Sequence, residues 1–393
     1  MKRILILLAL VAMSCTKQES MEELTARVFE RAAVQMRNLD ANLDSAAIQD
    51  PGKVLFPRSI KNNGKFWYTD HQWWCTGFYP GSLWLMYEYT EDESFRELAL
   101  KYQTPLEPLR YHKDDHDVGF QIMCSYGNCL RLTGDQECIP IIIDGAHSLA
   151  TRFSPVVGCT RSWRQKKNWD FIVIIDNMMN LELLLKAAEL EGNDTLKNMA
   201  LTHARTTIKN HFRENFSTYH LVDYSTETGE VLGKCTVQGL ADDSAWARGQ
   251  AWGLYGYTMM YRFTKEQDML DQAIGIAEYV IPRLPRDYVP FWDFDTLDAP
   301  DDVRDASAGA LIAGALIELS SYVDKKKSDK YLNAAEKILR ALASEEYLAD
   351  EGEQYGFLLR HGTGNKNKDY EVDKPLSYAD YYFLEALIRW NQL

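Results

Sequence analysis

Residues 171–181, Phe-Ile-Val-Ile-Ile-Asp-Asn-Met-Met-Asn-Leu, carry five apolar side chains directly into Asp176 and Asn177. The apolar spacing that follows predicts a helix over residues 175–191. An ionised carboxylate beside this much hydrocarbon is costly unless it is hydrogen-bonded or its pKa rises. Asp176 therefore has two interpretations, a helix N-cap or a general acid at the mouth of a pocket. The second is favoured because the same arrangement recurs along the chain.

Helical periodicity dominates the sequence, and the alternation typical of strands is scarce. Ser20 and Glu23 form a capping-box pattern at the start of the first segment. The expected helices are 21–39, 78–90, 93–108, 117–132, 135–152, 175–191, 194–212, 244–263, 266–283, 306–323, 327–346 and 377–392.

The loops between these helices alternate in character. The even-numbered helices, except the last, are followed by short polar turns, whereas the odd-numbered ones are followed by longer loops rich in Trp, Asp, His and Arg. Short loops join antiparallel neighbours. We therefore predict an all-α fold, an (α/α)6 toroid of six hairpins, as a single domain over residues 21–393. A helical solenoid is the alternative, but the loop asymmetry and the absence of capping repeats disfavour it.

Residues 1–20 are predicted to be an export signal and a short tether. Lys2 and Arg3 precede the apolar segment Ile4–Ala12, which is too short to remain as a transmembrane helix. Cys15 resembles the lipidated cysteine of bacterial lipoproteins, which predicts a periplasmic or outer-membrane-anchored protein whose membrane contact is its N-terminal lipid. Plain secretion is the alternative.

Composition restricts the possible partners. The net charge of −14 argues against nucleic acid, and an anionic substrate would need a local basic pocket. The ten Trp and 22 Tyr residues suit either a packed core or stacking on sugars. Apart from Cys15, the cysteines show no metal-ligand spacing, and Cys124 and Cys129 are expected as buried thiols in one helix.

Each even-numbered helix begins with polar and aromatic groups that its long loop delivers. In a toroid these groups converge on one opening. Together they provide aromatic platforms, a fixed cation for a uronate carboxylate and a carboxylate pair, which is the composition of a sugar site. The residues concerned include Trp74, His116, Asp117, Asp176, Gln238, Trp246, Arg248 and Trp252.

Taken singly, several of these residues have plainer explanations. Asp117 and Asp305 suit helix N-caps. Trp246 and Trp252 suit a hydrophobic core. Arg248 suits a salt bridge with Asp242 or Asp243 at the solvated rim, and Lys366 and Lys368 suit exposed loop positions.

A metal site at His112 and His116 is the other alternative, because three Asp residues lie beside them. No further His or Cys completes a ligand set, so we predict neither a metal nor a cofactor.

Longer motifs resemble the unsaturated glucuronyl hydrolases, glycoside hydrolase family 88. The resemblance covers nearly the whole chain after residue 20. It rests on His116-Asp-x-Gly-Phe120, Ile175-Asp-Asn-Met-Met-Asn180, Gln238-Gly-x-Ala-Asp-Asp-Ser-x-Trp-Ala-Arg-Gly-Gln-Ala-Trp252, Asp305-x-Ser-Ala308 and Tyr378-Ala-Asp-Tyr-Tyr-Phe-Leu-Glu-Ala-Leu387.

The resemblance implies an (α/α)6 enzyme that needs no metal. Such enzymes remove the terminal 4,5-unsaturated uronate from oligosaccharides that polysaccharide lyases produce, here fragments of heparin, chondroitin or hyaluronan. Asp176 matches the acid that protonates the double bond at C4 and helps activate the water that adds at C5. Asp117 matches a second carboxylate on the ring hydroxyls. Trp74, His116, His220, Thr236, Gln238, Trp246, Arg248 and Trp252 match substrate-binding positions.

Three other functions are alternatives to an unsaturated glucuronyl hydrolase. An unsaturated rhamnogalacturonyl hydrolase would share the fold and the chemistry, but its motifs fit less well. A toroid polysaccharide lyase would need a Tyr base, and a glycan-binding surface lipoprotein would not need Asp117 and Asp176 at the starts of adjacent inner helices. The loop with Lys366 and Lys368 leaves tolerance of sulfated substrates open.

Overall fold

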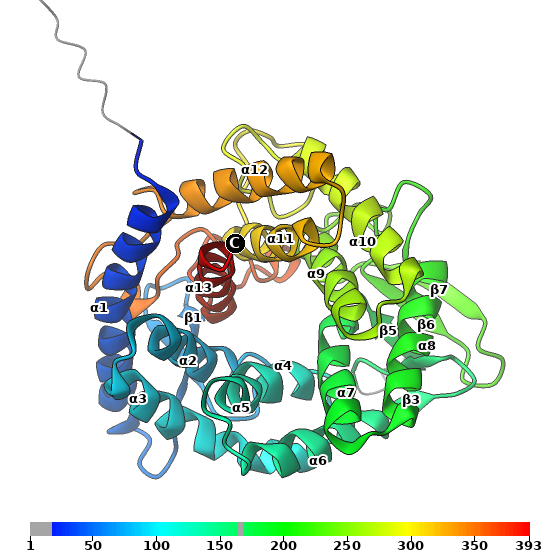
Figure 1. Ribbon diagram of the computed structural model, residues 1–393, viewed down its shortest axis with the longest axis horizontal. Helices are drawn as coiled ribbons and strands as arrows, with labels where there is room; N and C mark the ends of the chain where they lie inside the picture. Colours follow the sequence, from blue (N-terminus) through cyan, green and yellow to red (C-terminus); the bar gives the residue numbers. More distant parts are fainter. Residues whose placement is uncertain (1–17, 164–167) are drawn as a thin grey trace, which may run out of the picture.

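The computed structural model describes residues 18–163 and 168–393. Its helices form two concentric rings around one axis (Figure 1), so the predicted (α/α)6 toroid is confirmed. The predicted signal segment and Cys15 lie outside the described residues. Ser20 accepts a hydrogen bond from the Glu23 N–H at 3.1 Å and donates its own N–H to the Glu23 carboxylate at 2.7 Å, so the capping box is present.

The two rings differ in sequence because they differ in surroundings. The inner helices are apolar on nearly every side, whereas the outer helices are amphipathic and bury one face against them. The inner ring consists of α2 (Phe78–Thr90), α4 (Val118–Ile122) with α5 (Asn128–Thr133), α7 (Asn177–Glu191), α9 (Ala247–Thr264), α11 (Ala306–Ser320) and α13 (Ser377–Asn391). The outer ring consists of α1 (Met21–Ala47), α3 (Glu93–Gln103), α6 (Cys138–Ala150), α8 (Asp194–His211), α10 (Gln267–Val280) and α12 (Lys325–Leu342).

Several predicted helices differ in detail: the first, expected over 21–39, extends to Ala47, and the one expected over 266–283 ends at Val280 before a 3-10 turn, Ile281–Arg283. The helix expected over 93–108 ends at Gln103 and continues as a 3-10 segment, Thr104–Tyr111, because Pro105 and Pro108 cannot donate α-helical hydrogen bonds. The helix expected over 117–132 contains a π-helical turn, Met123–Gly127, between α4 and α5. No sequence pattern marked that turn.

Short antiparallel strands occupy the long loops, where the sequence predicted almost none. They are β1 (Phe56–Ile60) with β2 (Phe66–Thr69), β3 (Phe153–Ser154) with β4 (Cys159–Thr160), and a sheet of β5 (Phe171–Ile174), β6 (Leu221–Tyr224) and β7 (Val231–Cys235) in that order. The apolar run before Asp176 is therefore a strand, fully buried and paired from Phe171 with Tyr224 to Ile174 with Leu221. Four apolar residues are too few for periodicity to separate a strand from a helix start.

The long loops meet the inner helices at their N-terminal ends, which we call the loop end of the toroid. The C-terminal ends of the same helices, with the short turns, form the turn end. Within the described ranges, no helix has both the length and the hydropathy needed to cross a membrane.

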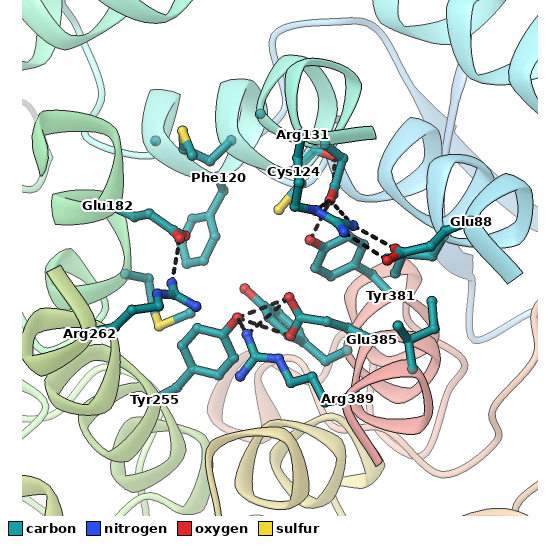
Figure 2. A pocket seen from close by; sticks show the side chains of 18 of the residues that line it. Glu88, Phe120, Cys124, Arg131, Glu182, Tyr255, Arg262, Tyr381, Glu385 and Arg389 are labelled. Carbon is teal, nitrogen blue, oxygen red and sulfur yellow. Dashed lines mark hydrogen bonds and ion pairs between the residues drawn. The ribbon is translucent and has the colours of Figure 1, made fainter. Parts of the chain in front are cut away.

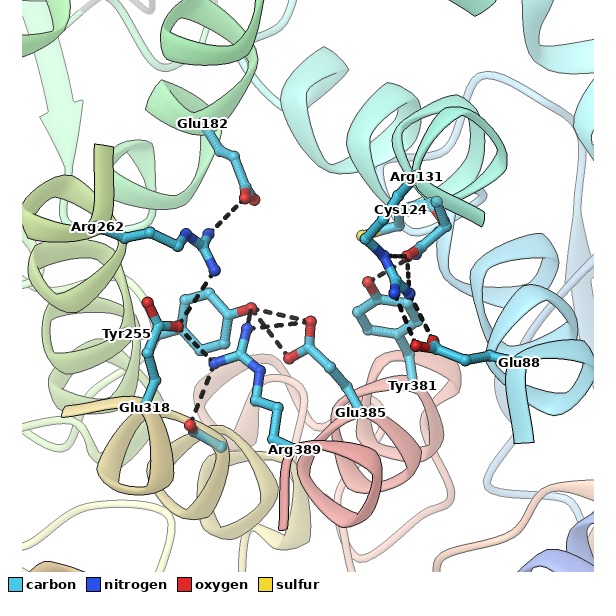
Figure 3. Close-up of polar contacts among 12 residues, drawn as sticks. Glu88, Cys124, Arg131, Glu182, Tyr255, Arg262, Glu318, Tyr381, Glu385 and Arg389 are labelled. Atoms are coloured by element: carbon cyan, nitrogen blue, oxygen red, sulfur yellow. Dashed lines mark hydrogen bonds and ion pairs between the residues drawn. The ribbon is translucent and has the colours of Figure 1, made fainter. Parts of the chain in front are cut away.

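The turn end is held by partly buried ion pairs (Figure 3). Arg262 of α9 pairs with Glu182 of α7 at 2.6 Å and with Glu318 of α11 at 3.2 Å, and Arg389 of α13 pairs with Glu318 at 2.8 Å. These contacts link four inner helices. Such pairs fix geometry more than they add stability, because each charge loses its hydration on burial.

A cavity of about 250 Å³ lies inside the ring at this end (Figure 2). Arg131 of α5 and Glu88 of α2 form another ion pair on its wall, at 2.6 Å. Neither candidate catalytic carboxylate, Asp117 or Asp176, lines this cavity.

Candidate active site

A second cavity, of about 390 Å³, opens at the loop end. Five of the predicted site residues line it: Trp74, Asp117, Asp176, Gln238 and Arg248. Loops and helix starts that are far apart in the sequence therefore meet here, as the toroid predicts. The remaining lining residues are Gln72, Trp73, Asp115, Trp163, Ile174, Val237, Gly364, Asn365, Lys368, Tyr370, Glu371 and Tyr378.

Asp176 stands between the end of β5 and the start of α7. Its side chain makes no capping hydrogen bond, so the N-cap interpretation is wrong. The Oδ2 atom is buried and has no hydrogen-bond partner. Burial raises the pKa of Asp176 to about 7, against the opposing effects of Arg248 and the Trp252 indole. A carboxyl group with this pKa holds a proton near neutral pH and can donate it.

Asp117 precedes α4 and likewise makes no capping bond. Asn180 of α7 donates to its Oδ1 at 3.3 Å. Burial first, and then the nearby charges of Asp115 and Asp176, raise the pKa of Asp117 well above its usual value. The two predicted carboxylates therefore share one cavity and influence each other's ionisation.

Each carboxylate has a buried histidine beside it. His220 Nε2 lies 3.9 Å from Asp176 Oδ2, and His116 Nε2 lies 3.6 Å from Asp117 Oδ1. Burial lowers the pKa of His220 to about 3 and that of His116 well below its usual value, so both rings are neutral.

The hydrogen-bond network assigns the tautomer of both rings. His220 Nδ1 accepts from the backbone N–H of Val237 at 2.9 Å. His116 Nδ1 lies 3.1 Å from the Asn180 amide nitrogen, whose orientation is fixed because Asn180 Oδ1 accepts from the Phe120 N–H at 2.9 Å. Both rings therefore carry their proton on Nε2, the atom that faces the carboxylate.

This tautomer bears on the metal alternative. Asp115, His116 and Asp117 can bring three ligand atoms within 4.8 Å of one another. Coordination by His116 Nε2 would require that nitrogen to lose its proton, and the proton would then have to sit on Nδ1, facing the Asn180 amide. The donor set therefore fits proton chemistry and does not fit a metal ion.

The partners of Arg248 differ from those predicted from the sequence. Its guanidinium is buried and donates to Asp305 at 2.5 Å and to the Thr363 and Gly364 carbonyls at 2.6 and 2.7 Å, so a solvated salt bridge with Asp242 or Asp243 is wrong. Asp242 accepts instead from the Thr236 N–H at 2.8 Å.

Asp305 serves two purposes at once. It caps α11 as predicted, accepting from the Ser307 N–H at 3.1 Å, and it also holds Arg248. The positive charge of Arg248 is thereby fixed within reach of Asp176 and of any anionic ligand in the cavity.

The other predicted residues lie behind the cavity wall. Trp246 and Trp252 are 3% and 1% exposed, so the core interpretation describes their packing. The Trp246 ring lies 4.8 Å from the His220 ring, and the Trp252 ring 5.2 Å from that of Phe120. The two indoles therefore pack against His220 and Phe120.

Thr236 and Gln238 make hydrogen bonds that fix the loops at the rim of the cavity. Thr236 Oγ1 accepts from the Gly239 N–H at 2.7 Å, and the Gln238 amide donates to the Gly364 carbonyl at 3.1 Å. Through these contacts the loop before α9 is joined to the last long loop, whose carbonyls also hold Arg248.

Some functional candidates were missed. Asn180 could have been found, because it lies four residues after Asp176 and therefore on the same face of α7. Tyr370 and Glu371 of the last loop had no such signal. Of the two lysines there, Lys368 lines the cavity, whereas Lys366 pairs with Asp302 at 2.5 Å.

Comparison with known proteins agrees with this geometry. Residues 55–390 match the family model described as Glycosyl Hydrolase Family 88. The chain belongs to that family. An unsaturated glucuronyl hydrolase of Formosa agariphila is 39% identical over 96% of this chain and 94% of its own.

A further relative and a solved structure indicate the same class of enzyme. An unsaturated chondroitin disaccharide hydrolase of Streptococcus pneumoniae is 32% identical, over 91% of each chain. A crystal structure of an unsaturated glucuronyl hydrolase specific for heparin has a TM-score of 0.88 and 42% identity, and it covers 94% of this chain and 98% of its own. This member of glycoside hydrolase family 88 is thus a glycosidase that removes unsaturated uronic acid from glycosaminoglycan oligosaccharides.

Proposed function

We propose that Asp176 is the acid of this reaction and that Asp117 is the second carboxylate, which orients the sugar through its hydroxyl groups. The observation that carries the proposal is the buried Oδ2 atom of Asp176, which makes no hydrogen bond and belongs to a carboxyl group whose pKa is raised to about 7 at the wall of the loop-end cavity. A carboxyl group in this state holds a proton near neutral pH and can donate it to a substrate in the cavity.

The proposed reaction starts with proton transfer from Asp176 to C4 of the C4=C5 double bond. Positive charge then develops at C5 and the ring oxygen. The resulting Asp176 carboxylate takes a proton from the water that adds at C5, which restores the acid. The hemiketal so formed opens, and the remaining sugar leaves.

The surrounding residues have roles that follow from their positions. Arg248 supplies positive charge for the uronate carboxylate, although its own hydrogen bonds are already made to Asp305 and two carbonyls. The Nε2–H groups of His220 and His116 are unpartnered donors that face the cavity carboxylates. Trp74 provides an aromatic wall.

For the substrate we propose an unsaturated disaccharide from heparin, chondroitin or hyaluronan. The test follows the ultraviolet absorbance of its double bond. We expect the absorbance to fall with the wild type and to stay constant with Asp176→Asn and with Asp117→Asn, both of which should fold. A rise on intact polymer would indicate a lyase. Binding without any change in the wild type would indicate a glycan-binding protein.

Lys368 is the residue of the last loop that we propose to contact a sulfate group. It lines the cavity, whereas Lys366 is held by Asp302. We expect Lys368→Ser to lower kcat/KM on 6-sulfated chondroitin disaccharide more than on the unsulfated one. Lys366→Ser is the matched control, and an equal loss on both disaccharides would refute a sulfate contact.

We also propose that the protein is exported and anchored by lipid at Cys15. The sequence of residues 1–15 supports this. Labelling cells with a radioactive fatty acid should mark the wild type and leave Cys15→Ser unlabelled. Label retained by Cys15→Ser would refute the anchor.

A further inference from the structure

Two cysteines approach each other where one helical hairpin of the toroid turns at the turn end. Cys129 lies in α5, Cys138 is the first residue of α6, and residues 134–137 connect the helices. Their Sγ atoms lie within 4.8 Å of each other. The two residues are 1% and 2% exposed.

No other pair of this kind occurs in the described part of the chain. The side chains of Cys129 and Cys138 are neighbours, and each is the first cause of the other's pKa shift. Cys75, Cys124, Cys159 and Cys235 have no cysteine among the groups that influence them.

The lowered pKa of one member of the pair favours thiol exchange. The neighbouring Cys138 thiol lowers the pKa of Cys129, which favours the thiolate form of this residue. Thiolates, and not thiols, attack disulfides, and a thiol with a pKa near the ambient pH attacks fastest.

We propose that Cys129 and Cys138 are a redox-active dithiol that a disulfide oxidant converts into an intrachain disulfide joining α5 to α6. The thiolate of Cys129 attacks one sulfur of the oxidant and releases its first thiol. Cys138 then displaces the second thiol from the mixed disulfide. Two protein thiols and one external disulfide give one protein disulfide and two external thiols, with the protons carried by the released thiols.

The local structure permits the bond. The sulfur atoms must close from within 4.8 Å to about 2.05 Å. Both cysteines lie near helix ends beside a turn with Gly134 in the left-handed conformation, φ 68°, so side-chain rotation and a small shift of the turn can bring them together.

The position also suits an exported protein. Disulfides persist in oxidising compartments, to which the signal-like residues 1–15 would direct the chain. The bond would close the hairpin whose opposite end presents His116 and Asp117 to the loop-end cavity.

Mass spectrometry of the mature protein tests the proposal. The reduced protein is equilibrated in buffers of rising oxidised-to-reduced glutathione ratio, blocked with N-ethylmaleimide in denaturant and cleaved with trypsin. Cleavage after Lys113, Arg131 and Arg152 places Cys129 in residues 114–131 and Cys138 in residues 132–152. We expect these two peptides to become covalently linked, and dithiothreitol to release them.

Cys124 lies in the same peptide as Cys129, which makes Cys124→Ser the matched control. It should still give the linked peptides, whereas Cys129→Ser should give none. Three results would overturn the proposal: both thiols blocked by N-ethylmaleimide at every glutathione ratio, a link that depends on Cys124, or stable glutathione adducts without a link. Oxidised wild type should also melt at a higher temperature than the reduced protein, and Cys129→Ser should show no such difference.

Discussion

His220 and Asp176 face each other across 3.9 Å, with the imidazole Nδ1 engaged by backbone N–H groups and its Nε2–H directed at the carboxyl group. The distance is too long for a hydrogen bond, but a neutral N–H dipole so close to a carboxyl group should favour its ionised form. Two substitutions of His220 separate the functions of its two ring nitrogens. In His220→Asn the side-chain oxygen can accept hydrogen bonds in the place of Nδ1, whereas in His220→Gln the side-chain amide can donate in the place of Nε2.

Activity should decline as the pH rises through about 7, because Asp176 must be protonated to act and burial raises its pKa to that value. In His220→Asn the decline should move to higher pH, since the N–H dipole beside the carboxylate is lost, and kcat should fall by about 10- to 100-fold. The measurement is kcat/KM from pH 5 to pH 9. His220→Gln should move the decline less, and an unchanged profile in both variants would contradict the role of Nε2.

Asp176→Asn should stabilise the protein at alkaline pH while abolishing activity. The pKa of Asp176 is about 3.8 when the chain is unfolded and about 7 in the folded protein, so ionisation opposes folding. The loss of stability that the raised pKa causes is absent below pH 4, grows between pH 4 and 7 and is complete above pH 7. One pKa unit corresponds to about 1.4 kcal/mol, so wild type should gain a few kcal/mol from the substitution at pH 8.

Urea unfolding of both proteins at pH 5 and pH 8 measures this difference. The advantage of Asp176→Asn should be larger at pH 8. An equal difference at both pH values would mean that Asp176 is ionised throughout, which is incompatible with its role as the acid.

Asn180→Leu should keep the size of the side chain and remove its hydrogen bonds. His116 and Asp117 would lose their donor, and the buried Phe120 N–H would lose its acceptor. The unsatisfied groups should cost about 1–3 kcal/mol of stability. A fall in kcat well beyond that expected from the folded fraction would show that Asn180 positions the catalytic groups. Asn177→Leu, which affects contacts with Ser162 and Thr160 and none with His116 or Asp117, is the control.

The sequence predicted the toroid because loop length and helical periodicity are local properties. It also placed Asp117 and Asp176 at one opening, because the N-terminal ends of neighbouring inner helices must meet there. It could not assign the partner of Arg248, since Asp305 is far away in the chain whereas Asp242 and Asp243 are near. Strand β5 was missed for a related reason: its hydrogen bonds go to β6, some 50 residues later.

Arg248→Met should destabilise the protein by about 3–5 kcal/mol, because Asp305 would remain buried without its partner. The double variant Arg248→Met, Asp305→Asn should recover part of that loss, since the amide carries no charge and can still cap α11. Thermal unfolding measures the recovery. Both variants should bind the unsaturated disaccharide more weakly than wild type, because the fixed positive charge is gone. Full recovery of stability with wild-type affinity would show that Arg248 serves only the fold.

Arg389→Met should separate stability from catalysis. This residue lies at the turn end, where it is 16% exposed, and it pairs with Glu318 at 2.8 Å and Glu385 at 3.3 Å. Removing one partner of these partly buried pairs should lower stability by about 1–3 kcal/mol, because two carboxylates lose their donor. The loop-end cavity shares none of these groups, so kcat/KM per folded molecule should stay within about twofold of wild type, as expected for distant, independent sites. A large loss of kcat/KM in fully folded protein, at a temperature well below its melting point, would show instead that the ion pairs at the turn end control the geometry around Asp176.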